Sequence, residues 1–349
     1  MTLKTTQMKA IKVVEAHKAE IQDSTLPKLR DDCVLCKVNW VAINPTDWKH
    51  IDFVPAPGAT SGCDFAGSVE WVGPTVKKDW KIGDRVAAFA HGCNASNLED
   101  GCFAEYALVK GDLQMKIPDS LSDEQATTLG VGIVTVGQAL FQKLGLPLPP
   151  AEHSGDLILI NGGSTATGSL AIQMANLSGY TVITTCSPRN FGFTRSLGAS
   201  KAFNYKDPAC GKKIRDYTNG RLKLAFDCIS EGNSARLCCE ALADDDSGSR
   251  IVYLNPISHP RGNVESSQVL AYTVNGEAFD KGTTHVSAAP EDLEFGKRFW
   301  ELATELFAKK LITTHPSMIC EGGLQGVIDG LDMLRAGKIS RKKLVYRVQ

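Results

Sequence analysis

The chain of 349 residues lacks any apolar run near the roughly 20 residues that a membrane-spanning helix requires. It also lacks an excess of either charge: the net charge is −1, which gives no support for nucleic-acid binding. Its first residues, Met1–Lys9, lack the apolar core of a signal peptide. With 43% hydrophobic and 22% charged residues the composition is that of a globular protein, and we expect it in the cytoplasm.

The cysteines give little sign of paired or metal-bound thiols. Their number, 11, is odd, and most lie in apolar segments, as small buried side chains do in a reducing compartment. Cys33 and Cys36 form a C-x-x-C, but they fall in an alternating strand pattern that would direct the two thiols to opposite faces. Since no second C-x-x-C lies nearby, the sequence favours neither metal binding nor redox chemistry at this place.

The pattern of the chain changes at a cluster of prolines near residues 147–150. Before it, short alternating runs separated by glycine turns predict a barrel-like β domain. After it, strand and helix patterns alternate, which predicts βαβ units and a parallel sheet. The expected strands are 157–160, 181–185, 202–204, 224–229 and 250–254, with helices near 167–178, 190–197, 209–218 and 232–243. Residues 256–290 are expected to be irregular, followed by helices at 291–309 and 322–335 and a strand at 343–348.

The segment Leu157–Ala175 organises the second half of the chain. An apolar strand passes through Gly162 and Gly163 into a helix, and this arrangement presents main-chain N–H groups to a phosphate. The dinucleotide pattern is incomplete, because Thr165 replaces the middle glycine of the three that usually mark it. Taken alone, the segment leaves nucleotide binding and an ordinary strand–helix turn equally open.

Several motifs in order point to one family. Gly62-Cys-Asp-Phe-Ala-Gly67, Lys81-Ile-Gly-Asp-Arg-Val86, Gly101-Cys-Phe-Ala-Glu-Tyr106 and Asn161-Gly-Gly…Gly168-Ser-Leu-Ala-Ile-Gln173 resemble the medium-chain dehydrogenase/reductase superfamily. Within it, Asn44-Pro-Thr-Asp-Trp-Lys49, Ser164-Thr-Ala-Thr167, Ser187-Pro-Arg-Asn190 and Leu254-Asn-Pro256 are similar to fungal trans-acting enoyl reductases, which partner iterative polyketide synthases. The resemblance covers the whole chain. It implies an α/β protein with a GroES-like β-barrel domain, residues 1–150 completed by 286–349, and a Rossmann domain with a doubly wound parallel sheet, residues 151–285.

The zinc ligands of the superfamily's alcohol dehydrogenases are missing. Those enzymes have a cysteine in place of Asn44 and a Gly-His-Glu motif in place of Gly62-Cys-Asp64. Of the cysteines that would hold their structural zinc, only Cys93 and Cys102 lie nearby, and two ligands cannot close a tetrahedral site. The resemblance therefore implies a zinc-free enzyme. Reduction of a conjugated C=C needs no metal, because the carbonyl already activates the electrophilic carbon.

The resemblance implies NADPH as the cofactor. The second Rossmann strand is followed by Ser187, Pro188, Arg189 and Asn190, with no acid to bind a ribose 2′-hydroxyl, and Arg189 suits a 2′-phosphate. Tyr205 would cover the adenine or reach the same phosphate. The hydroxyls around the glycine turn would add donors to its main-chain N–H groups. The other expected cofactor residues are Thr46, Asp47, Trp48, Lys49, Ser164, Thr165, Ala166, Thr167, Leu254, Asn255, Val345 and Tyr346.

For catalysis, charge that develops on the thioester oxygen needs a donor, and the α-carbon needs a proton. The resemblance points to Lys49 and Thr135 for these roles. Tyr106 is a weaker candidate acid, and water is a further source that the sequence leaves open. The substrate is expected to border a helix rich in small residues and part of the irregular segment: Val131, Gly132, Ile133, Val134, Thr135, Val136, Gly137, Asn275, Gly276, Glu277, Ala278 and Phe279.

The predicted protein is a monomeric enoyl reductase that acts in trans on a substrate carried by the acyl carrier domain of a polyketide synthase. Because such domains are acidic, the basic runs Lys338–Lys343 and Lys309-Lys310 are candidate docking residues. Two alternatives stay open: a quinone or enone reductase that uses the same core, and a cofactor-binding accessory protein of a synthase without catalysis of its own.

Overall fold

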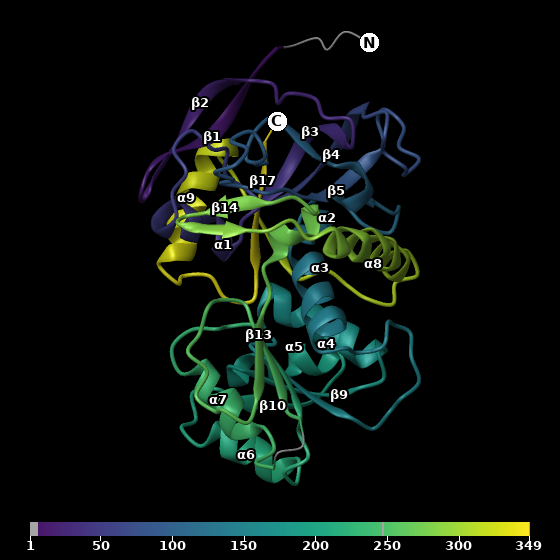
Figure 1. Ribbon diagram of the computed structural model, residues 1–349, viewed down its shortest axis with the longest axis vertical. Coiled ribbons are helices and arrows are strands. Elements are labelled where there is room, and N and C mark those ends of the chain that lie inside the picture. The colour runs from purple at the N-terminus through teal and green to yellow at the C-terminus, as the bar shows by residue number, and fades with distance from the viewer. Residues whose placement is uncertain (1–5, 246–247, 349) are drawn as a thin grey trace. The chain divides into compact units, whose positions relative to one another are not determined.

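A computed structural model describes residues 6–245 and 248–348 (Figure 1). The chain forms two compact units. The first combines the chain up to Val134 with the chain from Tyr272 onward, and the second runs from Thr135 to Ala271. The predicted domain boundaries, after residues 150 and 285, lie later in the chain than the two limits of the second unit, Thr135 and Ala271. The first unit therefore receives Tyr272 and the residues after it, which supply several side chains of its site.

The first unit is built on a sheet whose central strand is β3 (Cys33–Ala42). The strand order is β16-β17-β3-β4-β5-β7, and β6 also pairs with β3. One edge of β3 is shared, because β6 pairs along Cys33–Lys37 and β17 along Trp40–Ala42. The other strands span β4 (Asp64–Val72), β5 (Arg85–Phe89), β6 (Tyr106–Lys110), β7 (Met115–Lys116), β16 (Ser317–Cys320) and β17 (Lys343–Arg347). The C-terminal strands β16 and β17 thus extend the sheet that the N-terminal strands form.

An N-terminal hairpin and several helical segments also belong to this unit. The hairpin is antiparallel and consists of β1 (Gln7–Glu15) and β2 (Lys18–Thr25). The helical segments are α1 (Pro45–Phe53), η1 (Gly111–Leu113), α2 (Asp123–Ala126), α8 (Pro290–Ala308) and α9 (Gly323–Arg335). Ser122 caps α2, because its hydroxyl accepts the N–H of Gln125.

Alternation along β3 explains the C-x-x-C. Cys33 and Leu35 pack with Leu108 in one cluster, whereas Val34, Cys36 and Val38 belong to the main core of the unit. The two thiols therefore lie on opposite faces of the sheet, as the strand pattern predicted, and both are buried. Burial raises the pKa of the Cys33 thiol to about 12, which keeps it protonated and unreactive.

The second unit is a six-stranded parallel sheet with the order β10-β9-β8-β11-β12-β13, the order of a Rossmann fold. Its strands are β8 (Leu157–Asn161), β9 (Thr181–Cys186), β10 (Ala199–Asn204), β11 (Leu224–Asp227), β12 (Arg250–Tyr253) and β13 (Glu265–Gln268). The helices α4 (Ala166–Leu177), α5 (Phe191–Ser196), α6 (Cys210–Tyr217) and α7 (Ser234–Ala241) connect them, with η3 (Pro188–Asn190) before α5. The predicted doubly wound α/β class is confirmed.

The segment 256–290, predicted to be irregular, contains more structure than expected. It supplies the sixth parallel strand, β13, the turn η4 (Ala271–Asn275) and a small hairpin of β14 (Phe279–Lys281) and β15 (Thr284–Val286). The strand β13 lies at the sheet edge, and its sequence Glu-Ser-Ser-Gln has no apolar side chain. Strand recognition from hydrophobic pattern fails there, because an exposed edge strand has no need to bury a face.

The helix α3 (Gly130–Gly137) crosses from the first unit into the second at Val134, and a π-helical turn, η2 (Gln138–Lys143), continues it. No helix within residues 6–245 and 248–348 has the length and the apolar character needed to cross a bilayer.

Candidate active site

The glycine turn after β8 is tightly enclosed. Gly162 has φ +84°, and a Cβ on Gly168 would lie 2.3 Å from the carbonyl oxygen of Gly162. A Cβ on Gly163 would lie 2.1 Å from the Thr184 hydroxyl. The turn therefore tolerates only glycine at these three positions, and it leads directly into α4. The first N–H groups of this twelve-residue helix have no carbonyl partner within the helix, so the turn fits a pyrophosphate.

Thr165, the residue that departs from the dinucleotide pattern, is the N-cap of α4. Its hydroxyl accepts the N–H of Gly168 (2.9 Å) and donates to the carbonyl oxygen of Gly162 (2.9 Å). This hydroxyl is therefore engaged in the turn itself, whereas the sequence suggested that it would serve the phosphate. Ser164, Ala166 and Thr167 lie beside it, half-buried, at the start of the helix. The residue that looked like a defect in the motif stabilises the turn.

A chain of buried polar groups joins the carboxyl ends of four parallel strands, and the sequence did not reveal it. The Asn161 amide donates to Asp227 (2.8 Å) and accepts the Thr185 hydroxyl, which in turn accepts the N–H of Gly162 (3.1 Å). Asp227 also accepts the N–H groups of Ile229 (3.0 Å) and Ser230 (3.1 Å). The chain fixes the edge of the sheet on which a nucleotide would lie.

Ser230 extends this chain to the next strand. Its backbone has φ +52°, and its hydroxyl accepts the N–H of Leu254 (2.8 Å) while donating to the carbonyl oxygen of Asp227 (2.8 Å). The Asn255 amide donates to the carbonyl oxygen of Ser230 (3.4 Å). The predicted cofactor residues Leu254 and Asn255 are thus both hydrogen-bonded to Ser230, which follows β11. Four residues of this chain, Asn161, Thr185, Asp227 and Ser230, are at most 3% exposed.

The other predicted cofactor residues of this unit follow β9 and β10 at the same edge. Ser187 is half-buried, Pro188 and Arg189 are exposed at η3, and Asn190 is buried. Tyr205 directly follows β10 and is 48% exposed, so its ring is available to a ligand. Because β8, β9 and β10 are parallel neighbours, their carboxyl ends bring Gly162, Arg189 and Tyr205 to one edge of the sheet.

In the first unit, α1 presents the predicted residues Thr46–Lys49. Asn44 is extended (φ −119°, ψ 156°), the conformation that a following proline favours, and it is the N-cap of α1. Asp47 lies one turn later and accepts the N–H of Asn44 (2.7 Å). Burial raises the pKa of the Asp47 carboxyl to about 7. Lys49 is half-buried, with its Nζ 5.7 Å from the centroid of the Trp48 ring.

The Thr46 hydroxyl is directed to an aromatic cluster around Tyr272. The Tyr272 hydroxyl lies 2.9 Å from Thr46 Oγ1 and 3.5 Å from Cys63 Sγ. Its ring stacks on His91 at 4.1 Å between centroids and meets His50 edge-on at 5.3 Å. Burial lowers the pKa of His50 to about 4 and that of His91 to about 3, so both imidazoles are neutral at physiological pH. Sequence reasoning missed Tyr272, because its partners come from distant parts of the chain.

A pocket lies beside this cluster. It is lined by Val54, Pro55, Cys93, Ala95 and Gly282 together with four polar residues, His50, His91, Asp280 and Lys281. Burial lowers the pKa of Lys281, whose ammonium lies 5.8 Å from the centroid of the Tyr272 ring. The walls of the pocket therefore combine two neutral imidazoles with the ammonium of Lys281 and the acidic side chain of Asp280.

A buried ion pair fixes the start of α3, where the predicted substrate residues begin. Asp64 accepts the N–H of Val131 (2.6 Å) and pairs with the ammonium of Lys343, which also donates to the carbonyl oxygen of Thr128 (3.0 Å). The side chains of Asp64 and Lys343 are 0% and 4% exposed. A Cβ on Gly130 would lie 2.4 Å from the carbonyl oxygen of Ala88, so the helix starts against β5. Lys343, proposed from sequence as a docking residue, is buried and unavailable for docking.

The remaining residues of α3 are enclosed. Thr135, the predicted catalytic threonine, is 5% exposed, and Gly132, Ile133, Val134, Val136 and Gly137 are buried. Val345 and Tyr346, expected near the cofactor, are buried in β17, where Tyr346 belongs to the core cluster of the first unit.

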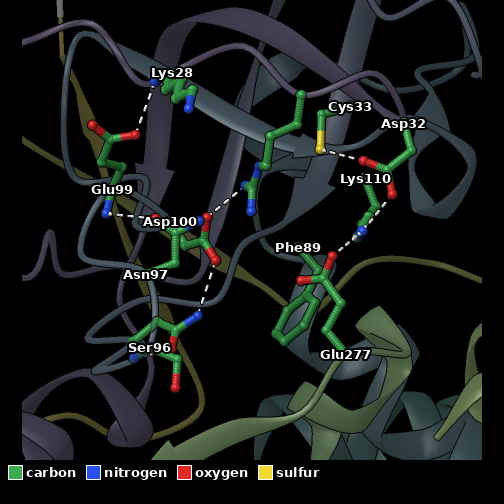
Figure 2. A network of polar contacts seen from close by, with 12 residues as sticks. Lys28, Asp32, Cys33, Phe89, Ser96, Asn97, Glu99, Asp100, Lys110 and Glu277 are labelled. Carbon is green, nitrogen blue, oxygen red and sulfur yellow. Dashed lines mark hydrogen bonds and ion pairs between the residues drawn. The ribbon is translucent and has the colours of Figure 1, made fainter. Parts of the chain in front are cut away.

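The predicted substrate segment 275–279 divides into two parts. Glu277 is directed outward and forms an ion pair with Lys110, which also pairs with Asp32 (Figure 2). Phe279 is directed inward, is 3% exposed and meets His91 edge-on at 4.7 Å. Asn275 and Gly276 are half-buried and Ala278 is exposed. Glu277 thus anchors the segment, whereas Phe279 contributes to the aromatic cluster.

The loop that corresponds to the structural-zinc region is held by polar contacts. Asp100, 7% exposed, accepts from Arg30 (2.5 Å) and from the Asn94 amide (2.9 Å), at the centre of the network in Figure 2. The Ser96 hydroxyl accepts the N–H of Asp280 (2.8 Å), which joins this loop to β14. Across the described ranges, no three His, Cys, Asp or Glu side chains gather closely enough to hold a metal ion.

Comparison with known proteins defines the class. Residues 30–119 match the alcohol dehydrogenase GroES-like domain, and residues 166–253 match the zinc-binding dehydrogenase domain. A solved alcohol dehydrogenase superfamily protein from Novosphingobium aromaticivorans has the same fold, with a TM-score of 0.81, 21% identity, and coverage of 98% of this chain and 100% of that one. The CurK enoyl reductase structure gives a TM-score of 0.76 at 17% identity, covering 98% and 99% of the two chains.

Curated relatives narrow the class. The trans-enoyl reductase ACTTS2 of Alternaria alternata is 45% identical over 97% of this chain and 98% of its own length. The trans-enoyl reductase resD of Aspergillus sclerotiorum is 44% identical over 97% of this chain and 99% of its own length. The trans-enoyl reductase TOXD of Cochliobolus carbonum is 50% identical over 84% of this chain and 99% of its own length. The chain belongs to the trans-enoyl reductase family of the medium-chain dehydrogenase/reductase superfamily, as the motifs predicted. It is therefore an oxidoreductase, and the family implies a nicotinamide cofactor.

Proposed function

We propose that the protein is an NADPH-dependent enoyl reductase that acts in trans on α,β-unsaturated thioesters carried by a polyketide synthase. The family membership over nearly the whole chain supports this function. When bound, NADPH supplies the hydride that adds to the β-carbon. The residues that would hold it are those at the carboxyl edge of the parallel sheet, together with Thr46–Lys49 of α1 and Val345–Tyr346 of β17.

The choice of NADPH rests on the segment after β9. Ser187–Asn190 contains a hydroxyl and a guanidinium but no carboxylate, and Arg189 and Tyr205 are both exposed at the edge that holds the glycine turn. A guanidinium binds a 2′-phosphate by charge-assisted hydrogen bonds, whereas an acid at this place would select the free ribose. Arg189→Ala should weaken NADPH binding about tenfold or more and leave NADH binding unchanged, since each such bond contributes about 1.5–3 kcal/mol.

The catalytic assignment stays with Lys49 and Thr135. Lys49 is half-buried on α1, and Thr135 lies in the small-residue helix whose start is fixed by Asp64. We assign the polyketide chain to the residues of α3 and to Asn275–Phe279, with Phe279 as the contact that is directed inward and Glu277 as an anchor.

Docking of the carrier domain is assigned to the basic residues that precede β16 and β17. These strands are parallel, and the N–H of Lys343 donates to the carbonyl oxygen of Pro316 (2.9 Å), so the segments 309–316 and 336–342 approach the same end of the sheet. Together they carry five lysines and arginines and no carboxylate: Lys309, Lys310, Lys338, Arg341 and Lys342. We propose a cytoplasmic monomer that presents this face to the acidic carrier domain.

The experiment that tests the function is NADPH consumption with a series of enoyl thioesters of increasing chain length, each as a free pantetheine thioester and as the carrier-bound form. Lys49→Ser and Thr135→Val should lower kcat on both forms. The double variant Lys338→Glu/Lys342→Glu should raise KM for the carrier-bound form alone. Reduction of quinones without reduction of any enoyl thioester would contradict the proposal, and so would NADPH binding without turnover of any acceptor.

A further inference from the structure

Tyr272 is a buried tyrosine whose ring contacts four other aromatic or imidazole rings. It is 4% exposed, its ring stacks on His91 and meets His50 edge-on, and the rings of Phe89 and Phe279 lie 5.7 and 6.1 Å away between centroids. A ring packed on several sides has one orientation for its hydroxyl. That hydroxyl is directed toward the start of α1 and of β4, because its partners are Thr46 and Cys63.

The hydrogen bonds around Thr46 determine which way the protons point. His50 Nδ1 lies 2.8 Å from the carbonyl oxygen of Thr46, which can only accept, so Nδ1 carries the proton of this neutral imidazole. His50 Nδ1 therefore cannot accept the Thr46 hydroxyl proton, although it lies 3.1 Å from Thr46 Oγ1. The acceptor that remains for Thr46 within the described chain is the Tyr272 oxygen at 2.9 Å.

It follows that the proton of Tyr272 is directed away from Thr46 and toward Cys63. A thiol sulfur is a weak acceptor, and its distance from the Tyr272 oxygen is 3.5 Å. The phenol is thus a strong, fixed donor on a poor partner, which a carbonyl oxygen would displace at little cost. Burial raises the pKa of Tyr272 well above its usual range, so the donor keeps its proton at any physiological pH.

We infer that the Tyr272 hydroxyl donates a hydrogen bond to the carbonyl oxygen of the enoyl thioester and so stabilises the negative charge that develops there during reduction. This inference rests on the proposed function. In the step, the electron pair of the C=C bond moves through the α-carbon to the carbonyl oxygen as the β-carbon gains hydride. Tyr272 keeps its proton and binds that oxygen. The enolate then reforms the carbonyl as its α-carbon takes a proton from water.

The role resembles that of an oxyanion hole, in which a donor is in place before the charge appears. Thr46 strengthens the donor by donating to the same oxygen, because a phenol whose oxygen accepts a hydrogen bond gives its own proton more readily. Thr46 is thereby a positioning residue for Tyr272, in addition to its proposed place among the cofactor residues.

The test compares Tyr272→Phe with Tyr253→Phe. Tyr253 is the matched control, since it is 3% exposed and its hydroxyl bonds His259 (2.9 Å) in the second unit, away from the Thr46 network. With S-crotonyl-N-acetylcysteamine and NADPH, Tyr272→Phe should lower kcat about 10²–10³-fold with little change in KM, as loss of one oxyanion donor does. With a nitroalkene, whose own group stabilises the developing charge, the loss should be much smaller. Tyr253→Phe should change neither rate.

A second readout needs no turnover. The thioester carbonyl is labelled with ¹³C, the substrate is bound together with NADP⁺, and its infrared stretching band is recorded. In the wild-type protein the band should move to lower frequency than in water, and in Tyr272→Phe it should not. Cys63→Ser offers the phenol a stronger acceptor that competes with the substrate, so it should lower kcat several-fold while the protein stays folded.

The outcomes separate the two proposals. If the wild-type protein reduces enoyl thioesters and Tyr272→Phe keeps its kcat within threefold with an unchanged carbonyl band, the inference is wrong and the proposed function stands. If the wild-type protein binds NADPH but reduces no enoyl thioester, the proposed function fails, and the inference fails with it.

Discussion

The two units build their sites in opposite ways. In the second unit, the candidate nucleotide residues stand directly after strands, and the buried chain of Asn161, Thr185, Asp227 and Ser230 joins strand ends that the parallel sheet already places side by side. In the first unit, Tyr272 stands in the turn η4, and its partners come from α1, from Cys63 just before β4 and from the loop at His91. A parallel sheet creates its site by topology, whereas a barrel closed by distant segments creates one by tertiary contacts.

The difference explains what the sequence could predict. The glycine turn, the residues after β9 and the Rossmann class follow from local pattern, so they could be predicted before the structure was known. The cluster of Tyr272, His50 and His91 could not, because each side chain has an unremarkable local sequence and the contacts span more than 200 residues. Glu277 illustrates the same limit: its position in the segment was predicted, but its ion pair with Lys110 depends on tertiary folding.

The largest effect should come from breaking the contact that closes the first unit. Lys343→Met leaves the Asp64 carboxylate buried without its cation, which typically destabilises a protein by about 3–5 kcal/mol. Urea denaturation should show this loss, and the start of α3 should become less protected in hydrogen exchange. Replacing both partners, as Asp64→Leu with Lys343→Met, should recover much of the stability.

The control for this prediction is Lys309→Ala, which removes an exposed pair with Glu305 (3.0 Å). Exposed pairs contribute at most about 1 kcal/mol, so the urea concentration at the midpoint of unfolding should hardly change in this variant. Equal losses in Lys343→Met and Lys309→Ala would show that the first unit does not depend on its long-range ion pair, and the contrast between the units would be wrong.

The second unit should be most sensitive at the glycine turn. Gly168→Ala places a Cβ 2.3 Å from the Gly162 carbonyl oxygen, so the turn must open and its N–H groups lose their alignment. We expect a loss of about 2 kcal/mol in stability, comparable to other strained backbone sites, and at least tenfold weaker NADPH binding by fluorescence titration. Gly192→Ala is the matched control, because a Cβ there meets no atom within 4 Å. It should be neutral or stabilising, and NADPH affinity should not change.

Acid should destabilise the first unit through its buried imidazoles. Burial lowers the pKa values of His50, His91 and His315 to about 4, 3 and 4, while the unfolded chain binds protons from about pH 6.5. Unfolding therefore takes up protons as the pH falls from 6.5 to 4, and stability declines in that range. Asp47 opposes this, because its pKa of about 7 lets the folded state bind a proton that the unfolded state binds only near 3.9.

A variant at His315 tests this pH dependence of stability. His315→Gln should reduce the slope of unfolding free energy between pH 6 and 4.5 by about 1.4 kcal/mol per pH unit, the contribution of one proton. Gly192→Ala, which removes no titratable group and whose Cβ meets no atom within 4 Å, is the control and should leave the slope unchanged. Equal slopes in the two variants would remove the link between burial at His315 and acid sensitivity.

The smallest effect is expected at Lys110. Lys110→Met removes the ion pairs with Asp32 and Glu277, whose side chains are 50% and 53% exposed, so the loss of stability should stay below about 1 kcal/mol. Its readout is specificity, since the segment that carries Phe279 loses one anchor: KM should rise more for long acyl chains than for crotonyl thioesters. A uniform rise in KM would indicate that Glu277 does not hold the substrate segment.

The ion pair between Asp64 and Lys343 also affects how the protein folds during its synthesis. The two residues are separated by 279 positions, so a chain growing on the ribosome contains Asp64 long before the cation that pairs with it exists. Until β17 is synthesised, the N-terminal barrel has an open edge along Trp40–Ala42 and a carboxylate that must stay hydrated. The second unit, which is continuous in sequence, can fold during that interval. The second unit would therefore fold first during synthesis, and the first unit would close only when β17 is complete.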